Sequence, residues 1–539
     1  MLGEIDTHMN TFTSLIETHA HKQPDAPALI YGEQVITYLE FNQRSRTVAA
    51  NLARLGIGKG DRVAIWLPNI PAWLEIFFAC AQLGAIAVAV NTRFRSSEVG
   101  DLLERSGSKL LVFWPDFKGI NFTNILNKIH TRFLTNIKTI VVYSEANESA
   151  STDIDEQSMI PYNLLLRSQN PLAIHLTTDT GCIIFTTSGT NTLPKLVLHK
   201  QSSVVQHARD VAHRFGYDQP KAMVLQAVPF CGVYGFSQAV AAFAVGAGMV
   251  CVPAFDVEDI LKLIDKYVIT QTNGSDEMFA RLLDARPERN PFPATNFCGY
   301  ANFTPSLSNV VDRADQQGLK LVGLYGSSEL LAFFAMQCPD DTVDARTRMG
   351  GFPVSDLTKV RVRDPKNDRL LKAGQIGELE FKCPSLMHQY FNNKEATSSA
   401  ITSDGFFRSG DLGRLCTDGS FEFLSRMGDV LRLGGFLVNP QEIETYIQRH
   451  PDVEGCQIIG IDSSRGTRPI GFVIMQETAT TSETDLINYC RAGMAKFKVP
   501  THIFLIDEFP TTTGPSGTKI QRTKLREMAI EKLTAANDT

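Results

Sequence analysis

The stretch Phe185-Thr-Thr-Ser-Gly-Thr-Asn-Thr-Leu-Pro-Lys195 directly follows an apolar run, Gly181-Cys-Ile-Ile-Phe185. The apolar run predicts a buried strand, and the small hydroxylated residues after it predict a loop. Such a loop leaves backbone N–H groups and hydroxyls free to surround phosphate oxygens, and Lys195 adds a positive charge. It is not a Walker-type loop, because the pattern G-x-x-x-x-G-K-S/T does not occur in the chain. A polar surface turn is the alternative interpretation.

Short β-rich runs alternate with amphipathic helical runs on both sides of this stretch. Strands are expected at Arg62–Leu67, Leu110–Trp114, Thr139–Tyr143, Cys182–Phe185 and Leu321–Leu324. Because helical runs separate them, the pattern predicts parallel sheets with helices on both faces. One helix has clear ends, since Thr37 can cap it, Glu40 completes a capping box and Gly56 ends it. The polar stretch Glu145–Ser158 is expected to form a surface loop.

After about residue 355 the alternation of strands and helices gives way to short strands. Short strands split by Asp/Gly turns are expected in a β-rich module at Lys359–Arg363, Gly377–Phe381 and Phe421–Leu424. A glycine-rich segment, Gly428 through Gly435, precedes Asn439-Pro-Gln-Glu442, where a cap residue followed by proline predicts a helix start. More strands are expected at Gln457–Ile461, Ile470–Met475 and Ile503–Ile506. We therefore divide the chain into residues 1–427 and a small C-terminal α/β domain, residues 428–539.

Length, composition and charge exclude several classes of protein. A chain of 539 residues predicts two or more domains. The net charge is −6 and there is no long basic run, which argues against nucleic acid as a partner. The ten cysteines include no C-x-x-C pair, which argues against a zinc site or a disulfide framework. No signal-peptide pattern, no apolar stretch of about 18 residues and no C-terminal Ser-Lys-Leu is present, so we expect a cytoplasmic protein without a transmembrane segment.

Three further segments carry residues suited to nucleotide chemistry. In Tyr325-Gly-Ser-Ser-Glu329, Glu329 is a hard oxygen ligand suited to Mg²⁺, although a strand end followed by a helix cap would look the same. In Phe407-Arg-Ser-Gly-Asp-Leu-Gly413, Asp411 accepts hydrogen bonds only and pairs well with a diol, although an Asp-Gly-type turn is the alternative. A lone C-terminal lysine such as Lys519 is by itself most often a solvated charge.

The loop after residue 185 resembles the phosphate-binding loop of the adenylate-forming superfamily, which includes acyl-CoA synthetases, peptide-synthetase adenylation domains and beetle luciferases. The family pattern is T-S-G-T-T-G-x-P-K, and the matching residues are Thr187, Ser188, Gly189, Thr190, Pro194 and Lys195. Asn191 replaces a threonine and Thr192 replaces a glycine. The other segments follow in the family's order as far as Arg522, so the resemblance covers nearly the whole chain.

The resemblance implies a role for each matching residue. Lys519 falls on the catalytic lysine that meets the carboxylate and the α-phosphate, although Thr518 is an extra residue before it. Gly428 falls on the hinge about which the C-terminal domain rotates between half-reactions. The implied catalytic residues are Lys519, Glu329 and Lys195, with Glu329 as the Mg²⁺ ligand. The implied ATP- and AMP-binding residues are Thr187, Ser188, Gly189, Thr190, Tyr325, Gly326, Ser328, Asp411 and Arg426, and Gly434 and Gly435 line the implied coenzyme A channel.

The acid pocket is implied around Pro229-Phe-Cys-Gly-Val-Tyr-Gly235. The candidate pocket residues are Gly232, Tyr234, Phe236, Tyr300 and Ala301, and ordinary core packing is the alternative for Tyr234 and Phe236. Gly232 stands where the family often has a histidine. No aspartate lies between Pro229 and Phe243 to pair a substrate ammonium, which favours an acid without an amine. The pattern is similar to that of enzymes acting on fatty, alicyclic or aryl acids, and chain length cannot be read from it.

The implied fold is α/β, with a large N-terminal domain of two α/β subdomains plus a β-rich subdomain, and a small mobile C-terminal α/β domain. The implied activity is that of an ATP-dependent acyl-CoA synthetase, which uses ATP, Mg²⁺ and coenzyme A and forms acyl-AMP with release of pyrophosphate. Three alternatives stay open: a ligase that loads a carrier-protein phosphopantetheine arm, a luciferase-like oxidase, and a non-catalytic nucleotide-binding protein. A homodimer is also left open.

Overall fold

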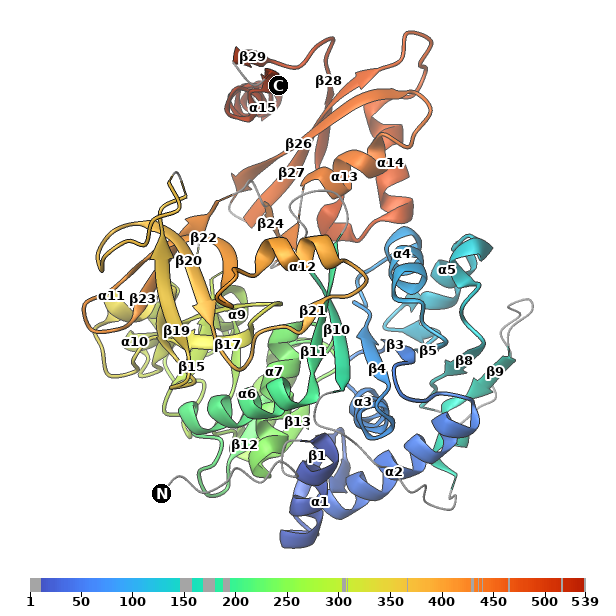
Figure 1. Cartoon of the computed structure of the whole chain (residues 1–539), viewed down its shortest axis with the longest axis vertical. Coiled ribbons are helices and arrows are strands. Elements are labelled where there is room, and N and C mark those ends of the chain that lie inside the picture. Colours follow the sequence, from blue (N-terminus) through green and yellow to red (C-terminus); the bar gives the residue numbers. More distant parts are fainter. Residues whose placement is uncertain are drawn as a thin grey trace.

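The computed structural model describes residues 11–145, 158–167, 180–187, 194–302, 307, 309–365, 367–427, 431–434, 436–438, 440–463, 466–514 and 517–537. A large N-terminal part carries a much smaller C-terminal part at one end, shown in orange to red in Figure 1. Both parts mix helices and strands, and the predicted α/β class with its large and small domains is confirmed. Whether the boundary falls at residue 428 stays a prediction, because residues 428–430 lie outside the described residues.

The first sheet has eight strands in the order β21-β11-β10-β4-β3-β5-β8-β9. The strands from β10 to β9 are parallel, whereas β11 and β21 are antiparallel to their neighbours. Their bounds are β3 (Arg62–Trp66), β4 (Ile86–Ala89), β5 (Leu110–Phe113), β8 (Thr139–Val142), β9 (Ser158–Pro161), β10 (Gly181–Thr187), β11 (Lys195–Lys200) and β21 (Gln389–Tyr390). The helices associated with it are α3 (Pro71–Leu83), α4 (Ser96–Ser106) and α5 (Phe122–Asn127). The parallel sheet predicted from the alternating pattern is therefore confirmed.

A second sheet has the order β12-β13-β1-β2, with β1 (Pro27–Tyr31), β2 (Gln34–Thr37), β12 (Met223–Gln226) and β13 (Gly248–Cys251). The first two helices, α1 (Phe12–Lys22) and α2 (Tyr38–Arg54), lie beside it at the end of the molecule opposite the C-terminal part (Figure 1). The capping box predicted for α2 is confirmed, because Glu40 N donates to the Thr37 hydroxyl and Thr37 N donates to Glu40.

A third sheet of nine strands joins a second α/β region, whose parallel strands lie within residues 273–327, to the β-rich module that follows residue 355. Its order is β14-β15-β16-β17-β18-β23-β22-β20-β19, and only β14, β15 and β16 are mutually parallel. The bounds are β14 (Asn273–Ser275), β15 (Cys298–Ala301), β16 (Leu321–Ser327), β17 (Leu331–Met336), β18 (Gly350–Pro353), β19 (Lys359–Arg363), β20 (Gly377–Lys382), β22 (Phe407–Leu415) and β23 (Phe421–Arg426). The helices of this region are α6 (Gln201–Arg214), α7 (Val233–Val245), α8 (Val257–Tyr267), α9 (Asp276–Ala285), α10 (Val310–Gln316), α11 (Val343–Thr347) and α12 (Lys394–Ala400).

The C-terminal part is built on three strands, with β26 antiparallel to β27 and β27 parallel to β28. Its elements are β24 (Leu431–Leu433), β25 (Phe436–Val438), α13 (Pro440–Ile447), β26 (Val453–Ser463), β27 (Gly466–Met475), α14 (Glu483–Gly493), the short 3-10 helix η5 (Lys496–Lys498), β28 (His502–Leu505), β29 (Thr511–Gly514), β30 (Gly517–Ile520) and α15 (Arg522–Asn537). The helix predicted to start at Pro440 does so, although its expected cap, Asn439, lies outside the described residues.

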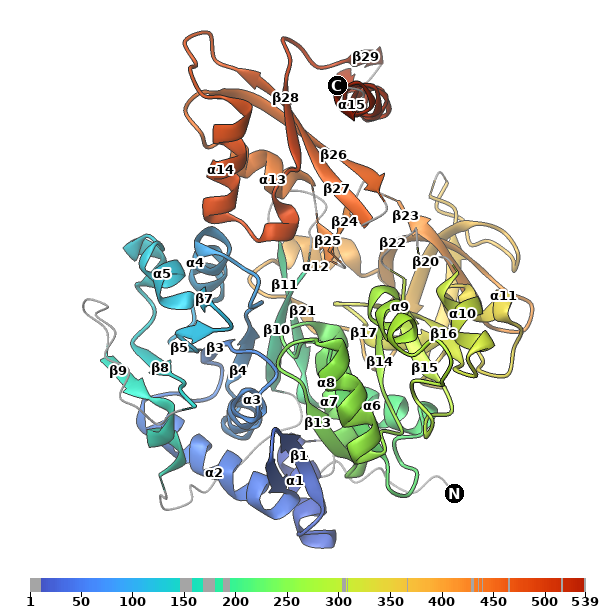
Figure 2. The ribbon, with the colours of Figure 1, turned by 180° about the vertical axis from the view of Figure 1, so that it is seen from behind.

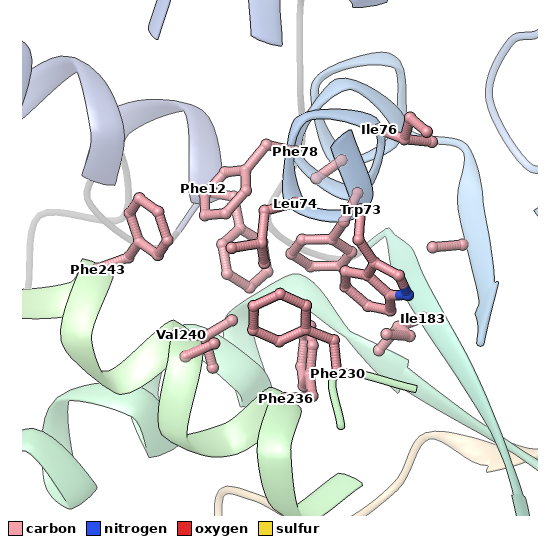
Figure 3. Close-up of a cluster of buried hydrophobic side chains, with 14 of the residues drawn as sticks. Phe12, Trp73, Leu74, Ile76, Phe78, Ile183, Phe230, Phe236, Val240 and Phe243 are labelled. Carbon is pink, nitrogen blue, oxygen red and sulfur yellow. The ribbon is translucent and has the colours of Figure 1, made fainter. Parts of the chain in front are cut away.

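The main core lies where α3 and α7 pack against each other (Figure 3). Both helices are apolar nearly all round, which is the pattern of a fully buried helix. The ring of Phe236 on α7 lies 4.9 Å from that of Phe77 on α3, and Trp73 and Phe230 lie 5.5 Å apart. This core holds α7 against the first sheet, and thereby places the loop and residues at the start of α7 beside the strand ends.

Two buried histidines near the third sheet give stability a defined pH dependence. Burial lowers the pKa of both His199 and His207 to about 4, and the Nε2 of His207 lies 2.7 Å from the Ala332 carbonyl. Each histidine is therefore neutral in the folded chain at pH values where the unfolded chain already binds a proton. Acidification from about pH 6.5 to about pH 5 should cost about 1.5 kcal/mol of unfolding free energy per histidine.

We expect His207→Gln to reduce this acid-induced loss of stability. Glutamine keeps a donor for the Ala332 carbonyl but does not titrate, so the variant should lose about 1.5 kcal/mol less between pH 6.5 and pH 5 than the parent. Urea unfolding at the two pH values measures the difference directly, and all other titrating groups cancel between the two proteins. An identical pH slope in both would show that His207 is protonated in the folded state.

Candidate functional site

The predicted phosphate-binding loop, between Thr187 and Lys195, joins two paired strands. β10 and β11 are antiparallel, and their register ends with Thr187 opposite Lys195. The far end of the loop is held by α4, because Arg105 Nη2 donates to the Pro194 carbonyl over 2.7 Å. Ser188, Gly189 and Thr190 lie outside the described residues, so their assignment to phosphate stays a prediction.

Lys195, Tyr390 and Glu329 form one half of the site. The Lys195 ammonium lies 4.5 Å from the centroid of the Tyr390 ring, and the Tyr390 hydroxyl donates to Glu329 Oε1 over 2.8 Å. The pairing of β11 with β21, which places Val197 opposite Tyr390, brings these residues together. Glu329 is buried with 8% of its surface exposed, so its carboxylate is oriented before any substrate arrives. Tyr390 was not singled out in the sequence, because its contribution depends on a strand pairing between distant segments.

The backbone beside Glu329 is anchored from β11 by a buried histidine. His199 Nε2 lies 2.7 Å from the Ser328 carbonyl, and its lowered pKa keeps the ring neutral so that Nε2–H donates. The amide of Met387 also donates to the Glu329 carbonyl over 2.7 Å. The segment that carries Ser328 and Glu329 is thus fixed from two directions.

Tyr325 and Asp411 form the other half of the site. The Tyr325 hydroxyl donates to Asp411 Oδ2 over 2.6 Å, and Asp411 is only 3% exposed. Asp411 lies in β22 directly opposite Arg426 of β23, so the backbone register brings two predicted nucleotide ligands side by side. The side chain of Arg426 lies outside the described residues.

The turn between β16 and β17 needs the glycine at position 326. A Cβ on Gly326 would lie 2.8 Å from the Ala332 Cα, so any side chain would push the two strands apart. Leu331 and Phe333 in β17 adopt positive φ angles of 65° and 62°, a conformation that is costly for such residues. Gly326 therefore allows β16 and β17 to approach closely at the turn that carries Tyr325 and Glu329.

Two of the five candidate acid-pocket residues, Phe236 and Tyr300, have side chains buried in hydrophobic cores, whereas Gly232, Tyr234 and Ala301 lie near one another. Tyr234 lies at the start of α7, and its hydroxyl donates to the carbonyls of Gly274 (3.0 Å) and Gly299 (3.3 Å) in β14 and β15. Burial raises the pKa of Tyr234 well above its usual value, so the hydroxyl stays a donor. Its ring packs 4.9 Å from that of Phe333. Gly232 has open space, since a Cβ there would meet only the Pro229 carbonyl at 3.6 Å.

Phe236 and Tyr300 point elsewhere. Phe236 is fully buried in the core of Figure 3, and Tyr300 packs in the core of the second α/β region, where its hydroxyl donates to the Thr347 carbonyl. The alternative interpretation of Phe236, ordinary core packing, describes its contacts. Ala301 ends β15 opposite Ser275 and is half-buried, so its backbone lies near the Tyr234 contacts.

The turn that carries Gly434 meets the N-terminal domain. Gly434 has a φ of 56°, and a Cβ there would lie 3.0 Å from Phe497 and 3.9 Å from Arg93 Nη1. The rings of Phe436 and Phe497 stack at 4.6 Å, and the Arg93 guanidinium lies 5.3 Å from the Phe436 ring. Neither ring nor arginine was predicted from the sequence, since no local pattern links residues so far apart. Gly435 lies outside the described residues.

Lys519 does not lie with the other predicted catalytic residues. It belongs to β30, which pairs with β29, and β29 and α15 lie at the outer end of the C-terminal part in both views (Figures 1 and 2). The side chain of Lys519 is outside the described residues, as is the predicted hinge Gly428. The structure therefore unites Lys195, Glu329, Tyr325 and Asp411, but not Lys519.

The described residues contain no group of three or more His, Cys, Asp or Glu side chains placed to hold a metal ion. Within the same ranges, no helix combines the length and apolar character needed to cross a membrane.

Family models match both parts of the chain. Residues 16–391 match the AMP-binding enzyme family, and residues 442–514 match the AMP-binding enzyme C-terminal domain. The putative acyl-CoA synthetase YngI of Bacillus subtilis (strain 168) is 29% identical over 541 residues, which cover 97% of each chain. The similarity therefore runs through both parts of the molecule.

Two solved structures of one enzyme, o-succinylbenzoate CoA synthetase (MenE) from Bacillus subtilis, show the same fold at 24% identity. A double mutant bound with its product analogue OSB-NCoA matches with a TM-score of 0.81, covering 95% of this chain and 98% of that one. The complex with the acyl-adenylate intermediate OSB-AMP covers 95% and 97% but matches with a TM-score of 0.66. With both family matches in chain order and the fold shared throughout, the chain belongs to the AMP-binding enzyme family, and so to the adenylate-forming superfamily.

Proposed function

We propose that this enzyme, an AMP-forming acid–thiol ligase, activates a carboxylic acid with ATP and then forms its coenzyme A thioester. The observation that carries the proposal is the convergence of Lys195, Tyr390 and Glu329 with the Tyr325–Asp411 pair, from segments separated by up to about two hundred residues. A nucleoside triphosphate requires a cation for its phosphates, a carboxylate for its Mg²⁺ and a hydrogen-bond acceptor for its two ribose hydroxyls. A pyrophosphate-release screen across carboxylic acids, with and without coenzyme A, tests it. Pyrophosphate release that needs an acid supports the proposal. If none of the acids tested gives release, only a nucleotide-binding role remains.

The first half-reaction is attack of the acid carboxylate on the α-phosphorus of ATP, which forms acyl-AMP and expels pyrophosphate. The chain's work is to position two anionic reactants and to offset their repulsion. We assign Lys195 and the hydroxyls of Thr187, Ser188 and Thr190 to the phosphates, and Asp411 and Arg426 to the ribose. Lys519 is assigned to the reacting carboxylate, which requires β30 to leave the position seen here.

Mg²⁺ fits the residues present as a companion of ATP. Magnesium is usually held by one or two carboxylates together with substrate phosphates, and Glu329 is a buried carboxylate beside Lys195 and Tyr390. Glu329 would hold the ion, which would neutralise charge on the phosphates when bound. A dedicated cage of protein ligands is not needed.

We propose a fatty, alicyclic or aryl acid of compact shape. Tyr234 spans the space between α7 and the strands β14 and β15, and its ring is backed by Phe333. Behind it lies a polar chain in which Asn273 donates to the Tyr217 hydroxyl and to Gln238. An alkyl tail gains nothing by entering polar surroundings, so long straight-chain acids should fail in the screen.

The second half-reaction transfers the acyl group to the thiol of coenzyme A and releases AMP. The stacked rings of Phe436 and Phe497 with Arg93 suit an adenine ring and a phosphate, which coenzyme A has. A carrier-protein arm lacks the nucleotide, so this cluster favours coenzyme A over that alternative. We also assign the enzyme to the cytoplasm, where its ten free cysteines stay reduced.

We expect Lys519→Ala to lower acyl-AMP formation about a hundredfold or more while leaving ATP binding largely intact. The lysine is the cation beside two anions in the transition state, and loss of such a group costs on the order of a hundredfold. Single-turnover pyrophosphate release measures the first step. Supplied with ready-made acyl-AMP, the variant should still make thioester. A wild-type rate of acyl-AMP formation would mean that the extra Thr518 has moved the lysine out of this role.

We expect Asp411→Ala to raise the KM for ATP about tenfold or more and to change the KM for the acid little. Hydrogen bonds to a charged group contribute about 1.5–3 kcal/mol, and the carboxylate would accept two of them from the ribose. Tyr325→Phe is the matched control, because it removes the 2.6 Å hydrogen bond but keeps the carboxylate. An unchanged KM for ATP in the alanine variant would make Asp411 a structural partner of Tyr325 and no more.

We expect Phe436→Ala to raise the KM for coenzyme A about tenfold without changing the KM for pantetheine. Stacking of a base on an aromatic ring contributes about 1–3 kcal/mol, and pantetheine has no base to lose. Thioester formation from supplied acyl-AMP, measured with each thiol, gives both values. An equal rise for both thiols would place the nucleotide elsewhere.

A further inference from the structure

Lys498 lies buried at the junction of the two domains. Only 7% of its side chain is exposed, and its ammonium lies 5.3 Å from the Phe94 ring and 5.9 Å from the Phe497 ring. Burial alone would lower the pKa of Lys498, but the carboxylates of Glu442 and Glu98 outweigh it and hold the pKa above its usual value. A permanent positive charge therefore sits between two acids at this junction.

The two acids belong to different domains. Lys498 Nζ lies 2.7 Å from Glu442 Oε2 in α13 and 2.8 Å from Glu98 Oε1 in α4. The other oxygen of Glu98, Oε2, accepts from the Ala495 amide over 2.9 Å. One ion pair and one hydrogen bond thus cross from the N-terminal domain to the segment just before β28.

Both charges keep a partner if the domains part. Glu98 Oε2 also accepts from the Arg95 amide over 3.0 Å, as the third residue of the α4 capping box, and this bond lies within the N-terminal domain. Lys498 likewise keeps Glu442 within its own domain. A buried pair is costly to break when a charge is left alone, and here neither is. Breaking the interdomain pair should therefore cost less than breaking a buried pair whose charges have no other partner.

We propose that Glu98 and Lys498 form an interdomain latch that holds the C-terminal domain in the arrangement for thioester formation. In this arrangement Phe436 and Phe497 meet Arg93 at the junction, while β30 with Lys519 lies at the outer end. Glu98 and Lys498 are positioning residues, since neither is assigned to substrate. The inference rests on the proposed two-step reaction for its kinetic test only.

The kinetic test uses Glu98→Gln, which removes the charge but keeps an amide oxygen that can accept from Arg95. Thioester formation from supplied acyl-AMP should fall about tenfold, with coenzyme A and with pantetheine alike, while single-turnover acyl-AMP formation stays equal or rises. Glu40→Gln is the matched control, because Glu40 holds the same third position in the capping box of α2, which lies at the end of the molecule opposite the junction (Figure 1), and it should change neither step. Equal losses in both steps, or no loss in thioester formation, would overturn the latch.

A second test does not depend on activity. Amide hydrogen exchange in the free full-length protein should rise in Glu98→Gln across residues 494–499 and stay unchanged across β26 and β27, because the former segment carries Lys498, whose ion pair across the domains is removed. This readout holds even if the substrates proposed above are wrong. Unchanged exchange in residues 494–499 would overturn the latch, whatever the kinetics.

The pairing itself is tested by a double-mutant cycle. Lys498→Met combined with Glu98→Gln should slow thioester formation no more than the more damaging single change, because both remove one interaction. Losses that multiply would show that the two residues act independently and would contradict the proposal.

Discussion

The position of β11 between β10 and β21 is the constraint on which the site depends. Its antiparallel pairing with β10 sets Thr187 against Lys195 and so fixes both ends of the intervening loop. Its pairing with β21 places Tyr390 over Lys195, and its His199 holds the Ser328 carbonyl. A shift of β11 by one residue would turn Lys195 to the other face of the sheet and would break the contact with Tyr390.

The two carboxylates of the site are buried, and each is held by a tyrosine. Glu329 and Asp411 are each nearly covered, and each accepts a hydrogen bond from a tyrosine, Tyr390 and Tyr325 respectively. Burial of a charge without a partner would cost several kcal/mol, and the tyrosine hydroxyls offset part of that cost while holding each carboxylate in one orientation. Preorganised acceptors of this kind lose little freedom when a nucleotide binds.

The role proposed for Lys519 requires a second domain arrangement. With α13 and η5 docked on α4 through Lys498 and Glu98, the strand that carries Lys519 lies at the far end of the C-terminal domain. On the proposed mechanism, Lys519 would reach the reacting carboxylate by rotation of the whole domain. The interdomain contacts described above include an ion pair, a hydrogen bond and an arginine–ring contact, and such contacts resist a domain motion less than a large apolar interface would.

The sequence by itself determined the local elements and the order of the motifs. The α2 capping box and the strand Lys359–Arg363 could be predicted because caps and alternation depend on neighbours a few residues away. The tertiary structure decided which side chains meet. Phe236 and Tyr234 are two residues apart on α7, yet one faces the core and the other faces β14 and β15, since helix geometry turns them about 200° apart. Tyr390 reaches Glu329 across 61 residues and Ala495 reaches Glu98 across 397, and only strand register and domain docking, which no local pattern encodes, bring such pairs together.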